Sequence, residues 1–456
     1  MEPFKVAIVG GSIAGLTVAL HLERLGIDWI LIERHPEIAP QLGASIALNP
    51  NGLSVLSQLG CVADIDVRCQ AMQVATVRTG NGGILKTFQV EDRIRSRFGW
   101  DVYFTERRVL VETLFRRIKD KQNIVTGQKV TKIHHTDQGN KVHILTEEGG
   151  TFTADMVVGA DGIHSPVRSA MWQMAAEEDP SVFGDNPASS IRTEFGCVFG
   201  ISHPTNNLEA GEAIQVHGKG LQVGTLLGPE GVVYWFVIFA YPTPLRGLDL
   251  PRYTLDDEAQ MIARANDIVI KPGTTFADVY KNKTMSYMTP LPDGTFDRWH
   301  YKRVICIGDS AHKMNPITGQ GGCMALESGV ALVDSIYAAL KQNNHQPLST
   351  DAVEKAFERV TESRKKRVVS VAEESMQAIR FGTWANSILW LLDNYLLWLI
   401  PTNLMVGIMV ASCYNGYVSN SLPPPVHKYK MTGAAESQAS HVTSYDEKGG
   451  VASKAS

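Results

Sequence analysis

A stretch close to the start of the sequence decides the fold: FKVAIVGGSIAGLTVALHLERLGIDWILIERHP, from Phe4 to Pro36. Val6–Val9 is a short apolar run rich in β-branched residues and predicts a buried strand. Leu16–Leu25 has helical periodicity, and Trp29–Ile32 predicts a second strand. This order of strand, helix and strand is typical of the βαβ unit that binds dinucleotides.

The turn between the first strand and the helix contains the small residues Gly10, Ser12 and Gly15. Small side chains let the backbone approach a pyrophosphate, whose negative charge lies at the positive end of the helix. Ser12 occupies the position of the second glycine of the motif. Glu33 follows the second strand, where a carboxylate accepts hydrogen bonds from the hydroxyls of an adenosine ribose. The sequence therefore predicts a nucleotide-binding α/β domain.

The composition sets the broad class of the protein. The 456 residues suffice for two or three structural units, and 44% hydrophobic with 20% charged residues is an ordinary globular balance. A formal net charge of −4 gives no indication of a nucleic-acid partner. The six cysteines form no CxxC pair or metal-ligand pattern, so we expect a reducing compartment and no metal. We expect no secretory signal peptide, because the first strand begins by Phe4.

The segment Trp384–Val418 is apolar, and Asp393 is its single charged residue. Pro401 divides it, so neither half comfortably reaches the about 20 apolar residues of a spanning helix. The segment is either a pair of helices packed on the main domain or a membrane contact, as an interfacial hairpin or a kinked span. Its many tryptophans and tyrosines are typical of a membrane interface, so we expect membrane association, with the catalytic part facing the cytosol at the endoplasmic reticulum.

Two further motifs pair a strand with a loop. The apolar run Met156–Val158 precedes the sequence GADGIHSPVR, which contains Asp161. The run Val304–Ile307 precedes a Gly-Asp pair that ends at Asp309, and a glycine-rich loop then opens a long helix. Such a helix holds a polar ligand at its N-terminus. Because the pyrophosphate occupies the first helix, we expect this one to face another part of the same cofactor.

With the three motifs in this order, the chain resembles the FAD-dependent aromatic-ring hydroxylases, the group A flavin monooxygenases, over roughly residues 4–380. The stretch GASIALNPNGLSVLSQLG, which includes Ala47, and the stretch FTERRVLVETL, which includes Arg107, are similar to family segments that flank the flavin. The opening GGSIAGL and the aromatic C-terminal segment are most similar to fungal monooxygenases of meroterpenoid and indole-diterpene biosynthesis. Many of those enzymes epoxidise a prenyl chain.

The resemblance implies bound FAD, with NADPH or NADH as a transient co-substrate. It implies that Glu33 binds the adenosine ribose and that Arg107, or alternatively Arg108, lies along the ribityl and pyrophosphate. Asp309 would accept a hydrogen bond from the ribityl or phosphate portion, and Asp161 would tie the cofactor loops together and help to admit the nicotinamide. Without the neighbouring motifs, Asp161 is a turn residue and Arg107 a solvated helix start. The implied cofactor-binding residues are Gly10, Ser12, Gly15, Glu33, Ala47, Arg107, Asp161, Asp309, Gly321 and Gly322.

The helix that starts near Gly321 and Gly322 has a further implied role. Its backbone amides would face the pyrimidine edge of the flavin, where a positive helix end stabilises the negative charge of the reduced cofactor. Cys323 stands where many relatives carry Asn. We expect a buried, inert thiol there, with oxidation by leaked peroxide as the alternative.

The expected architecture is α/β: a Rossmann-like FAD-binding domain with an interleaved antiparallel-sheet substrate domain and a helical C-terminus. Residues 1–180 form the first part of the FAD-binding domain, with some strands of the substrate domain, and residues 296–380 close it. The substrate sheet is predicted at 181–295, the hydrophobic membrane-associated helices at 384–418, and a disordered tail, rich in Ser, Gly, Ala and Lys, at 423–456.

The expected reaction is oxygen transfer from O₂, through reduced flavin, to a lipophilic small molecule. An alkene epoxidation needs no strong acid or base from the protein, whereas a phenol hydroxylation benefits from a base. The apolar C-terminal segment favours epoxidation of a prenylated molecule. The alternatives are an aromatic hydroxylase of a phenolic or polyketide substrate and a flavin-dependent dehydrogenase or reductase. Candidate pocket residues are Arg192 and Tyr234, taken as catalytic, and His217 and Trp235.

Overall fold

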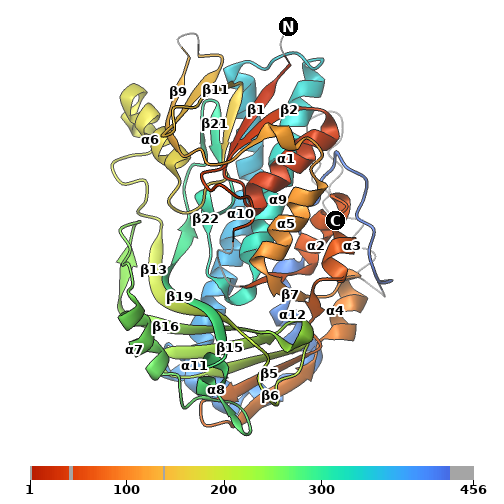
Figure 1. Cartoon of the computed structure of the whole chain (residues 1–456), viewed down its shortest axis with the longest axis vertical. Coiled ribbons are helices and arrows are strands. Elements are labelled where there is room, and N and C mark those ends of the chain that lie inside the picture. Colours follow the sequence, from red (N-terminus) through yellow and green to blue (C-terminus); the bar gives the residue numbers. More distant parts are fainter. Residues whose placement is uncertain (1–2, 41–44, 137–138, 432–456) are drawn as a thin grey trace, which may run out of the picture.

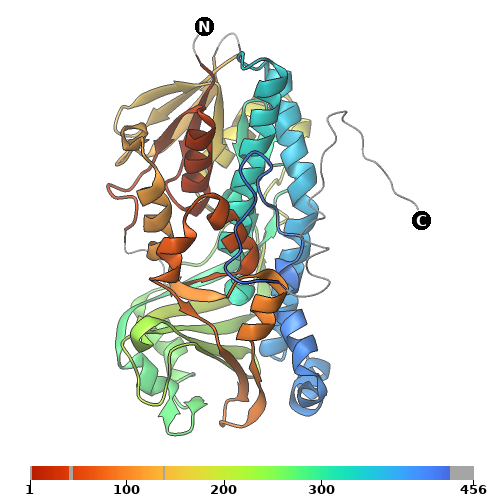
Figure 2. The ribbon, with the colours of Figure 1, turned by 90° about the vertical axis from the view of Figure 1, so that its right-hand side faces the viewer.

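The computed structural model of the chain describes residues 3–40, 45–136 and 139–431. Figure 1 shows a mainly parallel sheet in the upper half of the molecule and a mainly antiparallel sheet in the lower half. Two long helices, α9 (Gln320–Gln342) and α10 (Thr350–Gly382), connect the halves, and α10 contacts strands of both sheets (Figure 2). The two sheets therefore share one helical support.

The parallel sheet has six strands, and β1 lies in its centre between β12 and β2. Both of these pairs are parallel, as is the pair of β12 and β21. The predicted strands thus lie side by side, and the three loops that carry the motifs leave the same edge of the sheet. In spatial order the strands are β20 (His300–Tyr301), β21 (Val304–Cys306), β12 (Met156–Gly159), β1 (Lys5–Val9), β2 (Asp28–Ile32) and β8 (Ile124–Val125).

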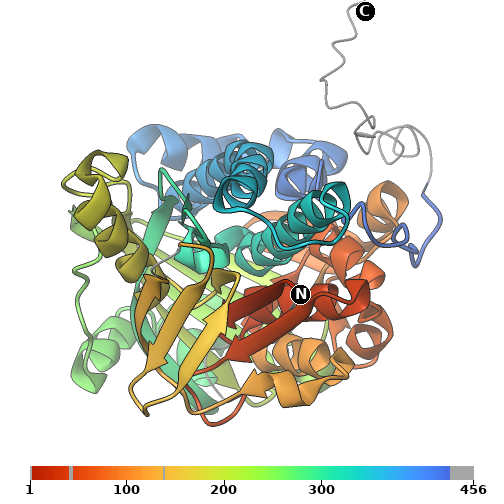
Figure 3. The ribbon, with the colours of Figure 1, turned by 90° about the horizontal axis from the view of Figure 1, so that it is seen from above.

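Helix α9 is the core helix of the cofactor half. It packs against α1 (Ile13–Leu25) and α10, and α9 and α10 lie together on one side of the parallel sheet (Figure 3). A side chain at Gly329 would lie 3.0 Å from Thr17, so this glycine permits the close approach of α9 and α1. Among the described helices, α9 alone is long and apolar enough to cross a membrane, and 78% of its most apolar stretch is buried inside the protein.

The antiparallel sheet has eight strands, of which β14 and β5 form a parallel pair. The strands β5 and β6 come from the first part of the chain, so the sheet is interleaved with the cofactor half, as the sequence predicts. In spatial order the strands are β22 (His312–Lys313), β19 (Lys283–Thr295), β13 (Arg192–Ser202), β16 (Val233–Arg246), β15 (Leu221–Leu227), β14 (Glu212–His217), β5 (Val74–Thr79) and β6 (Ile84–Gln89).

The apolar segment after α10 forms two short helices, α11 (Ser387–Tyr395) and α12 (Thr402–Met409), separated at Pro401. They lie beside the antiparallel sheet at the lower end of the molecule (Figure 1). With nine and eight residues, each is far shorter than the about 20 residues of a spanning helix. The pair packs on the main domain through one side, where Asp393 and Val406 are buried, and exposes large apolar side chains on the other.

After α12 the chain turns back along the cofactor half, and we call residues 414–431 the C-terminal strap. Val426 exchanges two hydrogen bonds with Ser57, and the Tyr429 amide donates to the Gly99 carbonyl at 3.0 Å. The prediction of a disordered tail is therefore wrong for residues 423–431, because specific hydrogen bonds hold them despite a polar, proline-containing sequence. Residues 432–456 lie outside the described residues.

The remaining elements complete the two halves. Helices α2 and α3 lie near the strap in the cofactor half, and α7 and α8 lie at the antiparallel sheet (Figure 1). The bounds are α2 (Pro50–Gln58), α3 (Val62–Asp66), α4 (Glu91–Phe98), α5 (Arg107–Arg117), α6 (Pro166–Glu178), α7 (Leu255–Ala263), α8 (Phe276–Tyr280), β3 (Ser45–Leu48), β4 (Gln70–Ala71), β7 (Tyr103–Glu106), β9 (Val130–His135), β10 (Val142–Thr146), β11 (Thr151–Ala154), β17 (Val269–Lys271) and β18 (Thr274–Thr275).

Candidate active site

A cavity of 680 Å³ opens at the edge of the parallel sheet where β1, β2 and β12 end. This volume is in the range of about 300–1,000 Å³ that is usual for ligand sites. Of the ten predicted cofactor-binding residues, all except Gly15 line the cavity. The sequence motifs therefore converge on one site: Gly10, Ser12, Glu33, Ala47, Arg107, Asp161, Asp309, Gly321 and Gly322.

Gly10 and Gly15 shape the turn at the start of α1. Gly10 has a φ of 109°, and a side chain there would lie 2.4 Å from the Ala160 carbonyl oxygen at the end of β12. A side chain at Gly15 would lie 1.9 Å from the Gly10 carbonyl oxygen. Gly15 thus holds the helix against the turn without lining the cavity.

The Glu33 carboxylate is fixed by backbone amides. Its Oε2 accepts a hydrogen bond from Gly11 N at 2.5 Å, and its Oε1 accepts one from His35 N at 2.8 Å. Each carboxylate oxygen has a second lone pair. The side chain is therefore held rigidly at the cavity wall while it still offers acceptors to hydroxyl groups.

Arg107 explains the serine at the second glycine position. Its Nη2 donates to Ser12 Oγ at 2.5 Å, so the first residue of α5 is tied to the turn before α1. Arg108 also lines the cavity but forms an ion pair with Glu112 at 2.6 Å, along the exposed side of α5. Of the two arginines, Arg107 is the one that contacts the glycine-rich turn.

Asp161 joins the second motif to α6. Its Oδ2 accepts a hydrogen bond from Val167 N at 3.0 Å, in the first turn of that helix. Burial raises the pKa of Asp161 to about 6, against the opposing effect of the hydrogen bond from Ser165. Its Oδ1 is buried, and no partner for it lies among the described residues. A buried acceptor without a partner, at the wall of a cavity, fits a site for a hydrogen-bonding ligand.

Arg168 connects the second and third motifs, a role that sequence reasoning missed. Its guanidinium donates to the Ser310 carbonyl at 2.8 Å and to the Ile163 carbonyl at 2.5 Å. It also lies over the ring of Phe296, 4.1 Å from the centroid. The available signal was an arginine at the end of the Asp-Gly motif, in the first turn of the helix that follows it.

Asp309 lines the cavity with Lys313, another residue that sequence reasoning missed. The Lys313 ammonium donates to Asp309 Oδ2 at 2.5 Å, and the Asp309 side chain is 38% exposed. The third motif thus presents an ion pair, with a positive charge close to the first turn of α9.

The first turn of α9 faces the cavity. A side chain at Gly321 would meet no atom within 4 Å, so its backbone borders open space. Cys323 lies on the other side of the helix, where its Sγ would be 2.6 Å from a side chain at Gly52. Cys323 is buried, as expected from the sequence, and burial raises the pKa of its thiol to about 12, which favours the protonated form at neutral pH.

The four candidate pocket residues of the antiparallel sheet do not line the cavity. Trp235 is buried on the far side, where its indole donates to Ser202 Oγ at 2.9 Å. His217 is bonded to Asp393 of α11 at 2.9 Å, which is a structural contact. Tyr234 is buried within an apolar cluster, and Arg192 is exposed near the start of β13. The catalytic roles of Arg192 and Tyr234 therefore stay predictions without support from this geometry.

Tyr287 is a partly exposed aromatic side chain of the antiparallel sheet that sequence reasoning did not single out. It is 39% exposed on β19, and its ring centroid lies 5.7 Å from that of Phe199 on β13. Burial and the nearby Cys197 raise the pKa of its phenol, and the positive charge of Arg107 opposes this effect. Like the four residues above, it does not line the cavity. The sequence does not single out Tyr287, because it is one of many apolar residues in the long strand β19.

The sequence is 34% identical over 396 residues to the FAD-dependent monooxygenase spyC of Aspergillus fumigatus, covering 87% of this chain and 83% of that protein. Residues 3–242 and 252–363 match the family model of the FAD binding domain. The chain belongs to the FAD-dependent monooxygenases. The monooxygenase janM of Penicillium janthinellum is a further relative, 33% identical over 428 residues that cover 92% of this chain and 86% of that one.

Solved structures confirm the predicted fold class of this monooxygenase. Klebsiella pneumoniae HpxO, complexed with FAD and uric acid, superimposes with a TM-score of 0.70 at 20% identity over 90% of this chain and 96% of that chain. CtdE, in complex with FAD and a substrate, superimposes with a TM-score of 0.67 at 19% identity, over 90% and 97% of the two chains.

The cavity fits the cofactor of the family. A tight glycine turn at a helix start, a fixed carboxylate, an arginine bonded to the turn and an open helix N-terminus match the phosphate, ribose and flavin parts of FAD. The monooxygenase therefore uses FAD, with NAD(P)H as the co-substrate typical of its class and a small molecule and O₂ as the other reactants.

Proposed function

We propose that this monooxygenase epoxidises an alkene in a prenylated, lipophilic molecule of fungal secondary metabolism, and that it works while docked on a membrane. The observation that carries the proposal is a large apolar surface on α11 and α12, beside the sheet that faces the cofactor cavity. A substrate that partitions into lipid is delivered most directly to an enzyme that rests on the same lipid.

The contacts at the cavity support the following cofactor roles. Glu33 binds the ribose hydroxyls, and Arg107 with Ser12 faces the pyrophosphate. Asp309 holds the ribityl or phosphate portion and is itself held by Lys313. When bound and reduced, FAD supplies the activated oxygen; the protein supplies orientation, a positive helix end at Gly321 and exclusion of water.

Part of the antiparallel sheet forms an apolar wall together with α10. Partly buried Phe199, Leu226, Ile317 and Met376 pack against its buried residues, and the ring of Phe199 contacts that of Tyr287. Such a wall holds a hydrocarbon chain but offers little acid–base chemistry. Epoxidation needs only an oriented alkene in a dry site, whereas hydroxylation of a phenol needs a base to form phenolate. The apolar wall therefore favours the alkene.

The outer face of α11 is apolar and its one acid is buried, which is the reverse of the usual pattern of a surface helix. Ile388, Leu391, Leu392 and Tyr395 recur at helical spacing, and all are exposed. The single acid of the helix, Asp393, points inward instead, where it accepts hydrogen bonds from the Trp384 indole at 2.7 Å and from His217. We call the exposed side chains the apolar patch: Ile388, Trp390, Leu391, Leu392, Tyr395, Leu396, Trp398, Leu399, Leu404 and Ile408.

Basic side chains border the apolar patch. Lys86 donates to the carbonyls of Trp398 and Ile400, and Arg93 and Arg97 donate to Asn403. An apolar face with a basic border suits a helix pair that lies in the headgroup region of an anionic membrane. We therefore favour an interfacial hairpin. All six cysteines are unpaired, which supports a position on the reducing, cytosolic side, for example of the endoplasmic reticulum.

Turnover with isotopically labelled oxygen tests the reaction. Purified enzyme receives NADPH and either an aromatic compound with a farnesyl or geranylgeranyl chain or the same phenolic head without the chain. We expect one labelled oxygen atom in an epoxide of the prenyl chain. A labelled hydroxyl on the ring of the bare phenol alone would make the enzyme an aromatic hydroxylase, and desaturation without label would make it a dehydrogenase.

Substitutions in the apolar patch test membrane docking. The variant Trp390→Ser/Leu391→Lys/Leu404→Lys should lose binding to phosphatidylcholine–phosphatidylserine vesicles while its melting temperature is unchanged. Leu255→Lys, at an 82% exposed position on α7, is the matched control and should bind as the natural protein does. Equal vesicle binding by all three proteins would exclude the patch as the contact. Truncation at Gly382 is unsuitable, because it also removes the strap from the cofactor half.

A further inference from the structure

A buried acid lies in the middle of the core helix α9. Glu327 is fully buried, and its carboxylate contacts Arg364 at 2.6 Å, Arg367 at 2.8 Å and the amide of Asn51 at 2.7 Å. Burial alone would raise the pKa of Glu327, but the two guanidinium groups outweigh it and lower the pKa to about 2. The group is thus ionised and fully paired.

Toward the cofactor cavity, Asn51 also contacts the first residue of α9. Asn51 Nδ2 donates to Gln320 Oε1 at 2.9 Å, and Gln320 Nε2 donates back to Asn51 Oδ1 at 3.3 Å. The N-cap residue Gly319 has no side chain to cap the helix, and it lines the cavity together with Gly321. The orientation of this turn therefore depends on side chains that reach it from α2.

Toward the C-terminus, Arg367 holds the chain just after α12. It donates to the carbonyls of Tyr414 at 2.6 Å and Ser412 at 2.9 Å. Gln320 also donates to the Cys413 sulfur at 3.6 Å. The chain that leaves the apolar patch is thus bonded to the same cluster as the first turn of α9.

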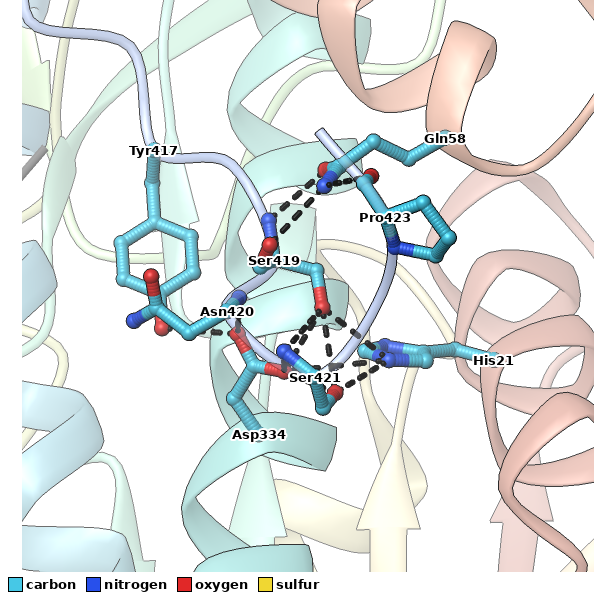
Figure 4. Close-up of polar contacts among 8 residues, drawn as sticks. All are labelled: His21, Gln58, Asp334, Tyr417, Ser419, Asn420, Ser421 and Pro423. Carbon is cyan, nitrogen blue, oxygen red and sulfur yellow. Dashed lines mark hydrogen bonds and ion pairs between the residues drawn. The ribbon is translucent and has the colours of Figure 1, made fainter. Parts of the chain in front are cut away.

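The strap has a second attachment seven residues further along α9, at Asp334 (Figure 4). Asp334 Oδ2 accepts from the Tyr417 hydroxyl at 3.0 Å and from Asn420 N at 2.9 Å, and Oδ1 accepts from Ser419 Oγ at 2.7 Å. This attachment lies away from the cavity, since Asp334 does not line it. The chain after α12 is therefore bonded near the cofactor by Gln320 of α9 and Arg367 of α10, and at a remote position by Asp334 of α9.

We propose that Asn51 and Gln320 are positioning residues for FAD: together with Glu327 and Arg367 they fix the first turn of α9 against the flavin, and residues 412–414 belong to this unit. The C-terminal segment then sets the environment of the flavin, beyond holding the enzyme on lipid. The inference depends on FAD binding in the cavity and is independent of the substrate and of the membrane proposal.

The test compares Asn51→Ala with Asp334→Asn, which both break buried hydrogen bonds of the α9–strap system. Fluorescence titration of the apoprotein with FAD gives the dissociation constant, and spectra during reduction give the flavin midpoint potential. We expect Asn51→Ala to weaken FAD binding by roughly tenfold, to lower the midpoint potential and to release more peroxide per NADPH. Asp334→Asn should lower the melting temperature of the apoprotein and leave the dissociation constant and the potential unchanged.

Two results would overturn the proposal: an unchanged potential and dissociation constant in Asn51→Ala, or the same shift in both variants, which would indicate a general loss of stability. If Asn51→Ala does not fold, Gln320→Met breaks the same link from α9 and is measured in its place. Asn51→Gln, which keeps the amide, should recover part of the potential shift. A failure of epoxidase activity with an intact flavin signature would count against the proposed substrate and leave this inference standing.

Discussion

Helix α9 and the pair α11–α12 are both strongly apolar, yet they lie in opposite environments. The most apolar stretch of α9 is 78% buried, whereas ten large side chains between residues 388 and 408 are exposed. Their acids do not distinguish them, because Glu327 and Asp393 are both buried and paired. The difference is in what covers the apolar stripe: α1, α2 and α10 pack on α9, and among described residues no element covers the outer stripe of α11. Composition alone thus does not separate a core helix from a helix with an exposed apolar face.

The largest expected effect is a charge placed in α9. Leu326→Asp puts an unpaired carboxylate at a fully buried position, and we expect a loss of more than about 4 kcal/mol in the free energy of unfolding, with no soluble yellow protein. Leu326→Ala should cost about 2–5 kcal/mol and still fold. Soluble yield and thermal unfolding followed by circular dichroism measure both. A folded, flavin-bearing Leu326→Asp would show that α9 is less enclosed than its burial indicates.

Next in size is the loss of the buried ion pair on the same helix. Glu327→Gln leaves the buried guanidinium of Arg364 and the partly buried one of Arg367 with no carboxylate, and we expect a loss of about 3–5 kcal/mol at pH 7. The pKa of Glu327 is about 2 when folded, below its ordinary value of 4.5, so its stabilisation is complete above pH 4.5 and lost as the pH falls toward 2. The free energy of unfolding, measured with urea between pH 4.5 and 2, should therefore fall less steeply with decreasing pH in the variant than in the natural protein.

The matched control is Glu112→Gln, which removes an acid whose partners Arg68 and Arg108 are 28% and 47% exposed. Its loss should be about 1 kcal/mol or less. Equal losses in the two variants would remove the distinction between the buried and the surface pair.

A smaller effect is expected at the loop before α9. Asp309→Ala removes an acceptor at the cavity and should weaken FAD binding by roughly tenfold without unfolding the protein. Loss of yellow colour on dialysis and fluorescence titration measure it. Lys313→Met breaks the same ion pair but leaves the Asp309 carboxylate in place. Comparing the two variants therefore separates a direct contact of Asp309 with FAD from a structural role of the ion pair. Protein that stays fully yellow through long dialysis would count against Asp309 as a cofactor residue.

The smallest effect on stability is expected in the apolar patch. Leu391→Lys changes a side chain that is 50% exposed, so the free energy of unfolding should move by no more than about 0.5 kcal/mol. The melting temperature of the purified protein without lipid measures this change. A large destabilisation would mean that the stripe of α11 is covered in the folded protein, and the contrast with α9 would disappear.

Local sequence patterns predicted most of the cofactor half. Short apolar runs at 6–9, 29–32 and 156–158 became neighbouring parallel strands, and the residues just after them line the cavity because parallel strands end at one edge. Side chains that act across long separations were missed. Asn51 and Gln320 are 269 positions apart, and no local period indicates that they meet.

The errors have a similar cause. His217 has the residue type of a catalytic group, yet its partner is Asp393, 176 positions away, which turns it into a structural contact. Residues 423–431 have the composition of a disordered segment, but hydrogen bonds with a few specific groups on α2, α4 and the loop after α4 are enough to order them. The composition of a segment indicates its average tendency, but it does not reveal a single hydrogen-bonding partner elsewhere in the fold.

The strap also affects the order in which the protein becomes complete during synthesis. Its residues 414–431 leave the ribosome after every element that they contact, including Gln58 of α2 and Asp334 of α9. Until then, these buried acceptors and donors in the cofactor half have no partners from the strap, while the apolar helices α11 and α12 have already emerged. The nascent chain therefore presents these apolar helices before the cofactor half is closed, and closure is completed by residues beyond 3–242 and 252–363, the ranges that the family model matches.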